Sequence, residues 1–225
     1  MKKVAVIVAG GSGQRMGNII PKQFLLLHQK PILWYTLDSF LRSYADLEII
    51  LVLPTMHTQM GKQVAAMFNA DHRFSFAEGG LSRFHSVQSG LRMIKNPSII
   101  FVHDAVRCLV SVPLIHRCYK AAIEMGTAIP SVASTDSIRI VHNNGNTAAD
   151  RQQIRIIQTP QTFHSDILLP AFEQPFNDLF TDEATVVEAY GKPVYLVEGE
   201  YENIKITRPV DIVLAEAILN GRSLL

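Results

Sequence analysis

The chain has 225 residues, of which 48% are hydrophobic and 18% charged, and its formal net charge is +1. This length and apolar content predict one large α/β domain, residues 1–225, and exclude an intrinsically disordered chain. The near-neutral charge excludes the basic excess that drives sequence-independent nucleic-acid binding. An anionic small molecule would therefore have to be bound by a few well-placed cations.

Cysteine usage and hydropathy favour a soluble, cytoplasmic protein. Cys108 and Cys118 show neither a disulfide framework nor a metal-ligand spacing, which fits a reducing compartment. The apolar run after Met1-Lys2-Lys3 is too short for a signal peptide and lacks a small-residue cleavage site. No stretch of the sequence approaches the roughly 18 apolar residues of a membrane span.

Strand-like and helix-like segments alternate along the chain, which predicts a mainly parallel sheet covered by helices on both faces. The first strand is expected at 2–9, where a β-branched apolar run opens into a glycine-rich loop. Further strands are expected at 48–53, 73–77, 98–102 and 127–132. Helices are expected from Pro31, over 58–68, around Val87 to Ile94, and over 112–125 with Gly126 as its end.

The pattern changes at Ser134. Residues 134–159 are polar and contain two strand-like pieces, 137–141 and 154–157, with the hairpin-forming pair Asn144-Gly145 between them. A hairpin with so little apolar surface would be marginal alone, so this arm is expected to pack on a partner subunit. Beyond it we expect one helix from about Ser165 and another that begins at 181–183. Short strands are expected at 193–197 and 203–206, and a last helix from 207–209 to Asn220, ended by Gly221.

The loop after the first strand is the strongest functional motif. A buried strand that opens into a glycine-rich loop brings backbone N–H groups up to a phosphate. Residues 10–17 contain four glycines, and the cations Arg15 and Lys22 lie close by. Met16 stands where a dinucleotide fingerprint needs its third glycine, and the P-loop motif is missing. A plain tight turn explains neither the four glycines nor the cations. We interpret the loop as a nucleoside triphosphate site that stabilises charge at the attacked α-phosphate.

Asp104 directly follows an expected strand, at the carboxyl edge where α/β sheets bind ligands. It could be a helix cap or turn residue. Beside a triphosphate, a Mg²⁺ ion held mostly by phosphate oxygens, with the Asp104 carboxylate nearby, is the better interpretation. His103 is expected to be structural, and the other seven histidines show no metal-ligand spacing.

The motifs resemble those of sugar-nucleotide-type nucleotidyltransferases, and among these the 2-C-methyl-D-erythritol 4-phosphate cytidylyltransferase family of the non-mevalonate isoprenoid pathway. The resemblance covers nearly the whole chain and implies a Rossmann-like three-layer nucleotidyltransferase fold with a protruding β-hairpin arm that forms a homodimer. The shared motifs are Ala9-Gly-Gly-Ser-Gly-Gln-Arg-Met-Gly17, Pro21-Lys-Gln23, Gly79-Gly-x-x-Arg83-x-x-Ser86-Val87, Val102-His-Asp-Ala-Val-Arg107, Asp150-Arg151, Gln158-Thr-Pro-Gln161, Thr181-Asp-Glu-Ala184, Val197-Glu-Gly199 and Asn203-Ile-Lys-Ile-Thr-Arg-Pro209.

The resemblance also implies a reaction, the transfer of CMP from CTP to 2-C-methyl-D-erythritol 4-phosphate with release of pyrophosphate. The acceptor phosphate is already anionic, so neither a covalent intermediate nor a strong base is needed, and catalysis rests on positioning and electrostatics. Arg15 and Lys22 match the family's catalytic cations. Contacts to CTP are expected from Ala9, Gly10, Gly11, Gly13, Gly79, Gly80, Ser86, Asp104 and Ala105, with Gly79, Gly80 and Ser86 in the cytosine-recognising loop.

The acceptor site is implied by residues farther along the chain. Arg107, Arg151, Thr181 and Lys205 match the family's methylerythritol phosphate site, and three cations with a hydroxyl suit a phosphate dianion. Ser137 stands where the family usually has a threonine. The arm, with Arg151, reaches into the neighbouring subunit in the family. Arg83 could belong to the cytosine loop or be an ordinary surface residue.

The sequence departs from the family pattern at two places, and it leaves two alternative functions open. The family's Ala-Ala-Arg-Pro pattern is 105–108 Ala-Val-Arg-Cys here, which is expected to loosen the turn that presents Arg107. The arm pattern is Asp136-Ser137-Ile138-Arg139 instead of Asp-Thr-Ile/Met-Lys.

Pentitol-phosphate cytidylyltransferases, which use ribitol 5-phosphate, are one alternative. They share the opening loop, although Thr181 to Ala184 and Ile204 to Pro209 favour the methylerythritol enzymes. The other rival is a nucleotide-binding regulator without catalysis.

Overall fold

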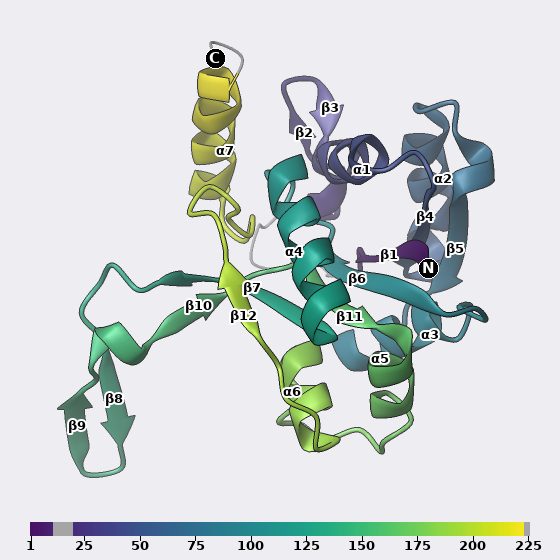
Figure 1. The fold of residues 1–225 in the computed structure, drawn as a ribbon. Coiled ribbons are helices and arrows are strands. Elements are labelled where there is room, and N and C mark those ends of the chain that lie inside the picture. Colours follow the sequence, from purple (N-terminus) through teal and green to yellow (C-terminus); the bar gives the residue numbers. More distant parts are fainter. Residues whose placement is uncertain (11–19, 223–225) are drawn as a thin grey trace.

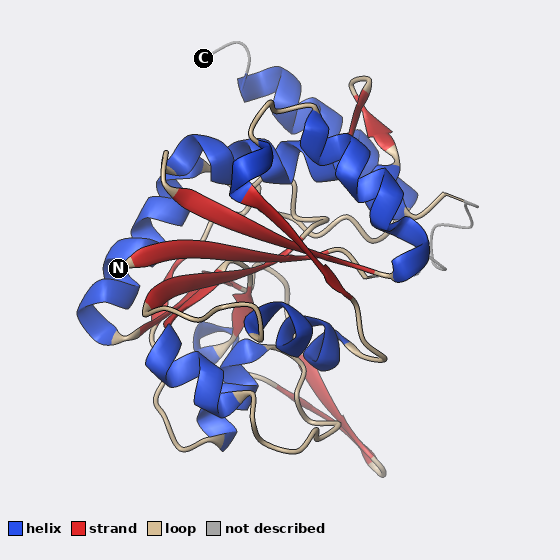
Figure 2. Ribbon diagram, turned by 90° about the vertical axis from the view of Figure 1, so that its right-hand side faces the viewer, coloured by secondary structure: helices blue, strands red, loops and turns tan. Residues whose placement is uncertain are grey.

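The computed structural model describes residues 1–10 and 20–222, and its centre is a twisted sheet with helices above and below it (Figure 2). The strand order is β10-β7-β11-β6-β1-β4-β5, with β12 also pairing with β7. Most pairs are parallel, and β10 and β11 are the antiparallel members. The strands are β1 (Lys2–Val8), β4 (Leu47–Leu53), β5 (Phe74–Glu78), β6 (Ser98–Asp104), β7 (Thr127–Ala133), β10 (Arg155–Ile157), β11 (Gln161–His164) and β12 (Leu196–Glu198).

Both faces of the sheet are covered, as the alternation of β1 shows. Its Ala5 and Ile7 pack into one buried cluster with α1, α2 and α4, while Val4 and Val6 pack into a second cluster with α3, α5 and α6. Strands that are buried on both faces are apolar throughout, which explains the continuous apolar runs of the sequence. The three-layer α/β fold expected from the sequence is confirmed. The helices are α1 (Ile32–Ser43), α2 (Thr58–Ala66), α3 (Arg83–Leu91), α4 (Val112–Met125), α5 (Ser165–Ala171) and α6 (Glu183–Ala189).

The C-terminal helix α7 (Pro209–Arg222) packs beside the small hairpin of β2 (Leu26–Leu27) and β3 (Lys30–Pro31), at the top of Figure 1. A third buried cluster joins Leu27, Ile206 and Ala215 there. The Ile206 N–H donates to the Val106 carbonyl at 3.0 Å. These contacts hold the segment before α7 against the carboxyl end of β6. Among the helices of residues 1–10 and 20–222, none has both the length and the apolar character needed to cross a bilayer.

The arm, residues 134–159, protrudes from the body, but its pairing differs from the expected one (Figure 1). β8 (Arg139–His142) pairs with β9 (Gly145–Ala148) as a tight hairpin, and β10 instead pairs with β7 of the central sheet. The expectation that 137–141 pairs with 154–157 is therefore wrong. Closing the hairpin over its tight turn costs less conformational entropy than closing the longer connection.

Two smaller expectations also need correction, and one strand of the central sheet was not expected. The segment 203–206 is a loop and not a strand. Within this loop the Asn203 side chain donates to the Thr159 carbonyl at 2.8 Å. The antiparallel strand β11 was not expected. The last helix continues through Gly221, where Arg222 donates to the Leu109 carbonyl at 2.9 Å and pairs with Glu202.

Candidate active site

A cleft of about 280 Å³ lies at the carboxyl ends of β1 and β6, where these strands run side by side with Val8 opposite Asp104. This is the edge at which α/β sheets bind ligands. Seven residues predicted from the sequence line it: Ala9, Gly10, Lys22, Gly80, Ser86, Asp104 and Lys205. The lining is completed by Val8, Gln23, Leu81, Ser82, Arg83 and Val106.

The residues that flank the glycine-rich loop form the floor of the cleft. The Ala9 N–H donates to the Val52 carbonyl at 2.9 Å, and the buried Gln23 side chain donates to the Ala9 carbonyl at 2.7 Å. Lys22 lies in a 3₁₀ turn (Lys22–Phe24), and its Nζ donates to the Ile206 carbonyl at 3.0 Å. Gln23 was not predicted as a site residue, although it adjoins Lys22 in the shared motif. Gly11, Gly13 and Arg15 lie outside the described residues.

The loop that leads into α3 is closed by hydrogen bonds of Ser86. Its hydroxyl donates to the Ser82 carbonyl at 2.9 Å and accepts from the Gly80 N–H at 3.1 Å. A Cβ on Gly80 would lie 2.4 Å from the Cβ of His85, so glycine alone fits this close approach. Gly79 does not line the cleft, and its N–H donates to the Leu53 carbonyl at 2.8 Å. The Ser86 hydroxyl thus fixes the loop backbone against which a base would lie.

Three cations surround the Asp104 carboxylate. The distances are 2.8 Å to Lys205 Nζ, 3.2 Å to Arg83 Nε and 3.7 Å to Arg107 Nε. Burial alone would raise the pKa of Asp104, but the positive charges of Arg83, Lys205 and Arg107 hold it well below its usual range. Asp104 is therefore ionised, and it ties the end of β6 to α3 and to the segment before α7.

Arg83 is not an ordinary surface residue. Its guanidinium forms a forked pair with Glu183, in which Nη1 contacts Oε1 and Nη2 lies 3.0 Å from Oε2, while Nε faces Asp104. Burial would lower the pKa of Arg83, but the two carboxylates raise it above its ordinary value. Glu183 is 1% exposed and stands at the first position of α6, directly after the capping residue Asp182. The sequence predicted Glu183 as part of a helix start, and no pattern in it indicated the partner Arg83, 100 residues away.

Apart from Lys205, the residues predicted for the acceptor site do not line the cleft of this single chain. Arg107 donates to the carbonyls of Asn203 at 2.9 Å and Ile157 at 3.3 Å. Ser137 and Arg151 are exposed on the arm, and Thr181 is exposed just before α6. Ala105, expected to contact CTP, is fully buried. Of the described nucleotide residues, the structure therefore brings Ala9, Gly10, Gly80, Ser86 and Asp104 together with Lys22 and Lys205 in the cleft. Arg107 contacts Asp104 from outside the lining, and Ser137, Arg151 and Thr181 do not line the cleft.

His103 lies beneath the cleft and has the structural contacts expected of it. Its Nδ1 lies 2.9 Å from the Thr159 hydroxyl and its Nε2 lies 3.2 Å from the Arg107 carbonyl. The Thr159 Oγ also accepts from the Asp104 N–H at 3.2 Å. Complete burial lowers the pKa of His103 to about 3, so the ring is neutral. It supports the turn that carries Asp104 and Arg107.

The comparison with known proteins decides the family. Residues 3–221 match the family model described as 2-C-methyl-D-erythritol 4-phosphate cytidylyltransferase. The chain belongs to this family. Relatives of that name from Bacteroides fragilis and Bacteroides thetaiotaomicron are 42% and 43% identical, each over 97% of this chain and 100% of its own length. The crystal structure of 4-diphosphocytidyl-2C-methyl-D-erythritol synthase from Anaerococcus prevotii superposes with a TM-score of 0.82 at 28% identity, covering 97% of this chain and 99% of that one.

The departure from the cytidylyltransferase pattern after Asp104 is accommodated by packing. Val106 and Cys108 are buried in the cluster that contains Leu27 and Ile206. The Arg107 N–H donates to the Asp104 carbonyl at 3.0 Å, so the turn is closed by a hydrogen bond without the usual proline.

The donor set of the cleft does not fit a metal ion held by the protein. Within residues 1–10 and 20–222, no group of three or more His, Cys, Asp or Glu side chains is arranged to hold one. Asp104, the carboxylate considered for Mg²⁺, is surrounded by three cations, which oppose a fourth positive charge at the same oxygens.

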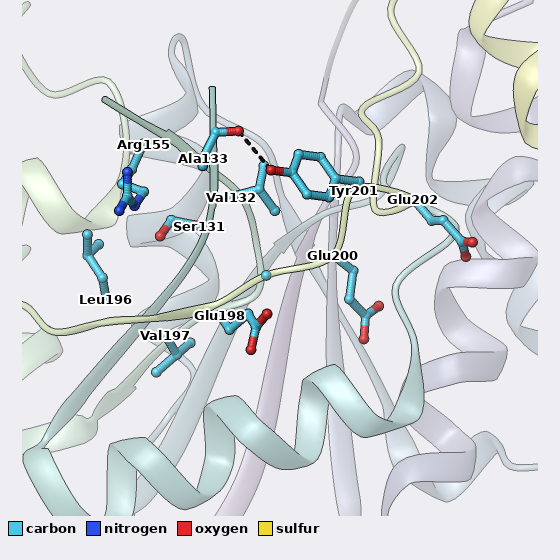
Figure 3. Close-up of a pocket in the computed structure, with 11 residues that line it drawn as sticks. Ser131, Val132, Ala133, Arg155, Leu196, Val197, Glu198, Glu200, Tyr201 and Glu202 are labelled. Carbon is cyan, nitrogen blue, oxygen red and sulfur yellow. Dashed lines mark hydrogen bonds between the residues drawn. The ribbon is translucent and has the colours of Figure 1, made fainter. Parts of the chain in front are cut away.

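A second depression, of about 680 Å³, lies between β7, β10 and β12 and contains none of the residues predicted for the cytidylyltransferase site (Figure 3). Its lining carries three glutamates, Glu198, Glu200 and Glu202, which disfavour anionic substrates. Tyr201 crosses it and donates to the Ala133 carbonyl at 3.2 Å (Figure 3). Charge therefore favours the smaller cleft as the candidate active site.

Proposed function

We propose that the cleft at the ends of β1 and β6 is where this cytidylyltransferase transfers CMP from CTP to 2-C-methyl-D-erythritol 4-phosphate. The products are 4-diphosphocytidyl-2-C-methyl-D-erythritol and pyrophosphate, on the route to isoprenoid precursors. The observation that carries the proposal is that Lys22, Asp104 and Lys205, all at family motif positions, line one cleft.

In this proposal the nucleotide occupies the part of the cleft between the loops. Gly80 and Ser86 supply a rigid edge for the cytosine, in support of which the Ser86 hydroxyl accepts from the Gly80 N–H. Gly79, which does not itself line the cleft, precedes them in the same loop. The triphosphate lies along Ala9, Gly10, Gly11 and Gly13. Arg15 and Lys22 stabilise the negative charge that develops when the acceptor phosphate attacks the α-phosphorus and pyrophosphate leaves.

The acceptor is proposed to bind beside Lys205 and Arg107, with Thr181 nearby. Ser137 and Arg151 are proposed to come from the arm of a second copy, which makes the enzyme a homodimer. The proposal is supported by the exposure of every residue of β8 and β9, including the apolar Ile140 and Val141 at 50% and 81%. A mostly polar arm that stands free of its own body with Ile140 and Val141 exposed gains stability by packing on another chain. We place this dimer of single-domain chains in the cytoplasm.

Mg²⁺ enters the proposal as an ion held by the phosphate oxygens of CTP and not by Asp104. Hard divalent cations commonly keep water and substrate phosphates as most of their ligands. No step assigned to a residue of this chain depends on the ion.

Pyrophosphate release from CTP and Mg²⁺, with methylerythritol 4-phosphate or ribitol 5-phosphate as acceptor, tests the proposal. We expect turnover with methylerythritol phosphate and much less with ribitol phosphate. Faster turnover with ribitol phosphate would assign the chain to pentitol chemistry. Nucleotide binding without turnover of either acceptor would make it a regulator.

A further inference from the structure

We propose that Arg83 and Glu183 form a positioning pair for cytidylyl transfer, which fixes Asp104 and, through it, the cation Lys205. The inference rests on the proposed function, because it concerns how that same cleft is held in its reactive geometry. The sequence motifs left Arg83 open between the cytosine loop and the surface, and they assigned Glu183 no role in binding or catalysis.

The pair joins three elements that are far apart in the chain. Arg83 is the first residue of α3, Glu183 is the first residue of α6, and Asp104 is the last residue of β6. One guanidinium contacts both carboxylates, with Nη1 and Nη2 on Glu183 and Nε on Asp104. The cytosine-recognising loop before α3, the end of β6 at Asp104 and the start of α6 are thereby fixed to one another.

All three guanidinium nitrogens of Arg83 already contact carboxylates, so Arg83 differs from a residue that binds phosphate. Two of its nitrogens bind the nearly buried Glu183, and the third faces Asp104. A planar guanidinium can hold two carboxylates at fixed angles, whereas the single ammonium of lysine cannot span them in this way. Arg83 therefore orients charge within the cleft, and it does not supply a free cation to the triphosphate.

The effect passes to the acceptor side through Asp104. Its Oδ1 faces Arg83, while its Oδ2 faces Lys205 at 2.8 Å. The other end of the pair is also anchored, because the Gln161 side chain accepts from the Ala184 N–H and donates to Asp182, each at 2.8 Å. Thr181 immediately precedes this anchored helix start. Moving Arg83 would therefore shift groups on both sides of the reacting phosphates.

Four variants test the pair: Arg83→Gln, Glu183→Gln, the double variant and Arg83→Lys. We expect Arg83→Gln to lower kcat by about 10–100-fold with KM for CTP changed by less than about threefold, since misplaced reacting groups cost rate more than binding. Glu183→Gln should lower kcat by about tenfold, and the double variant should match Arg83→Gln, because contacting residues do not lose function additively. Arg83→Lys should stay near Arg83→Gln. Arg92→Gln removes an exposed arginine just beyond α3 and serves as the matched control, expected to keep wild-type kcat.

Thermal unfolding of the same variants separates positioning from plain stability. Replacing both members of a buried ion pair is often neutral for stability, whereas leaving one charge unpaired is costly. Arg83→Gln leaves the buried Glu183 without its guanidinium, whereas Arg83 in Glu183→Gln keeps its contact with Asp104. We therefore expect the double variant to regain the Tm lost in Arg83→Gln while kcat stays low. Recovery of kcat together with Tm, full activity of Arg83→Lys, or losses that multiply in the double variant would each overturn the inference. Absence of pyrophosphate release by the wild type would instead reject the proposed function.

Discussion

Lys205 Nζ lies 2.8 Å from Asp104 Oδ2, so the cation proposed for the acceptor phosphate is paired with a carboxylate of the nucleotide cleft. The contact joins the end of β6 to the segment before α7, across 101 positions of the chain. A long lysine side chain has high rotamer freedom, and this pairing restricts it before any substrate arrives. Under the proposed function, the acceptor phosphate would meet a cation already held at the cleft by Asp104.

Replacing Lys205 should weaken the acceptor more than the nucleotide. We expect Lys205→Met to raise KM for methylerythritol phosphate by about 10–100-fold, since a hydrogen bond to a charged group contributes about 1.5–3 kcal/mol. KM for CTP should change little. Steady-state pyrophosphate release with each substrate varied in turn measures both constants. Lys120→Met, on the exposed side of α4, is the control. An equal rise in both KM values would contradict an acceptor-side role.

Lys22 should act on the chemical step. Its Nζ lines the cleft and is held at 3.0 Å from the Ile206 carbonyl, so it is directed before the reaction begins. We expect Lys22→Ala to lower the single-turnover rate by ~10²–10³, the usual cost of removing one preorganised donor to a developing charge. Equilibrium binding of CTP, followed by titration calorimetry, should weaken far less. Comparable losses in rate and affinity would show that Lys22 merely binds the nucleotide.

Elements that depend on local chemistry were predictable from the sequence. The helix expected at 112–125 has those bounds in the structure, because Ser111 caps its start and Gly126, with φ of 84°, ends it. The continuous apolar runs of β1, β4 and β6 likewise predicted their burial. Both cases rest on residues that are neighbours in the sequence.

Features that depend on distant partners were not predictable. β10 resembles the second strand of a hairpin, but β7 lies next to it in the fold and takes its hydrogen bonds. In the same way, no spacing rule connects Arg83 with Glu183. The family motifs did identify Lys22, Asp104 and Lys205, which line one cleft in the structure. A family resemblance can point to residues that meet only in the folded chain, whereas composition and periodicity describe neighbouring residues alone.

The shared-site proposal predicts complementation between subunits. If Arg151 of one copy serves the Lys22 cleft of the other, a mixed dimer of Arg151→Ala and Lys22→Ala chains contains one site with both residues intact. We expect the mixture, after subunit exchange, to regain up to about half of the wild-type activity per mixed dimer, while each parent alone stays low. Mixed dimers purified with two different affinity tags provide the measurement. Activity no higher than that of the parents would place Arg151 outside the partner's site.

The neutral, buried His103 should make folding sensitive to mild acid. Its pKa is lowered by burial to about 3, whereas an unfolded histidine titrates near 6.5, so the unfolded chain binds the extra proton between these values. This contribution to stability is complete above the unfolded pKa and declines as the pH falls, by about 2 kcal/mol at pH 5. His103→Gln keeps a donor and an acceptor but removes the titration. We therefore expect the Tm advantage of the wild type over His103→Gln to shrink between pH 7 and pH 5 in thermal unfolding. His72→Gln, at an exposed position, is the control substitution. A constant difference over that range would mean that the His103 ring is not held neutral by its surroundings.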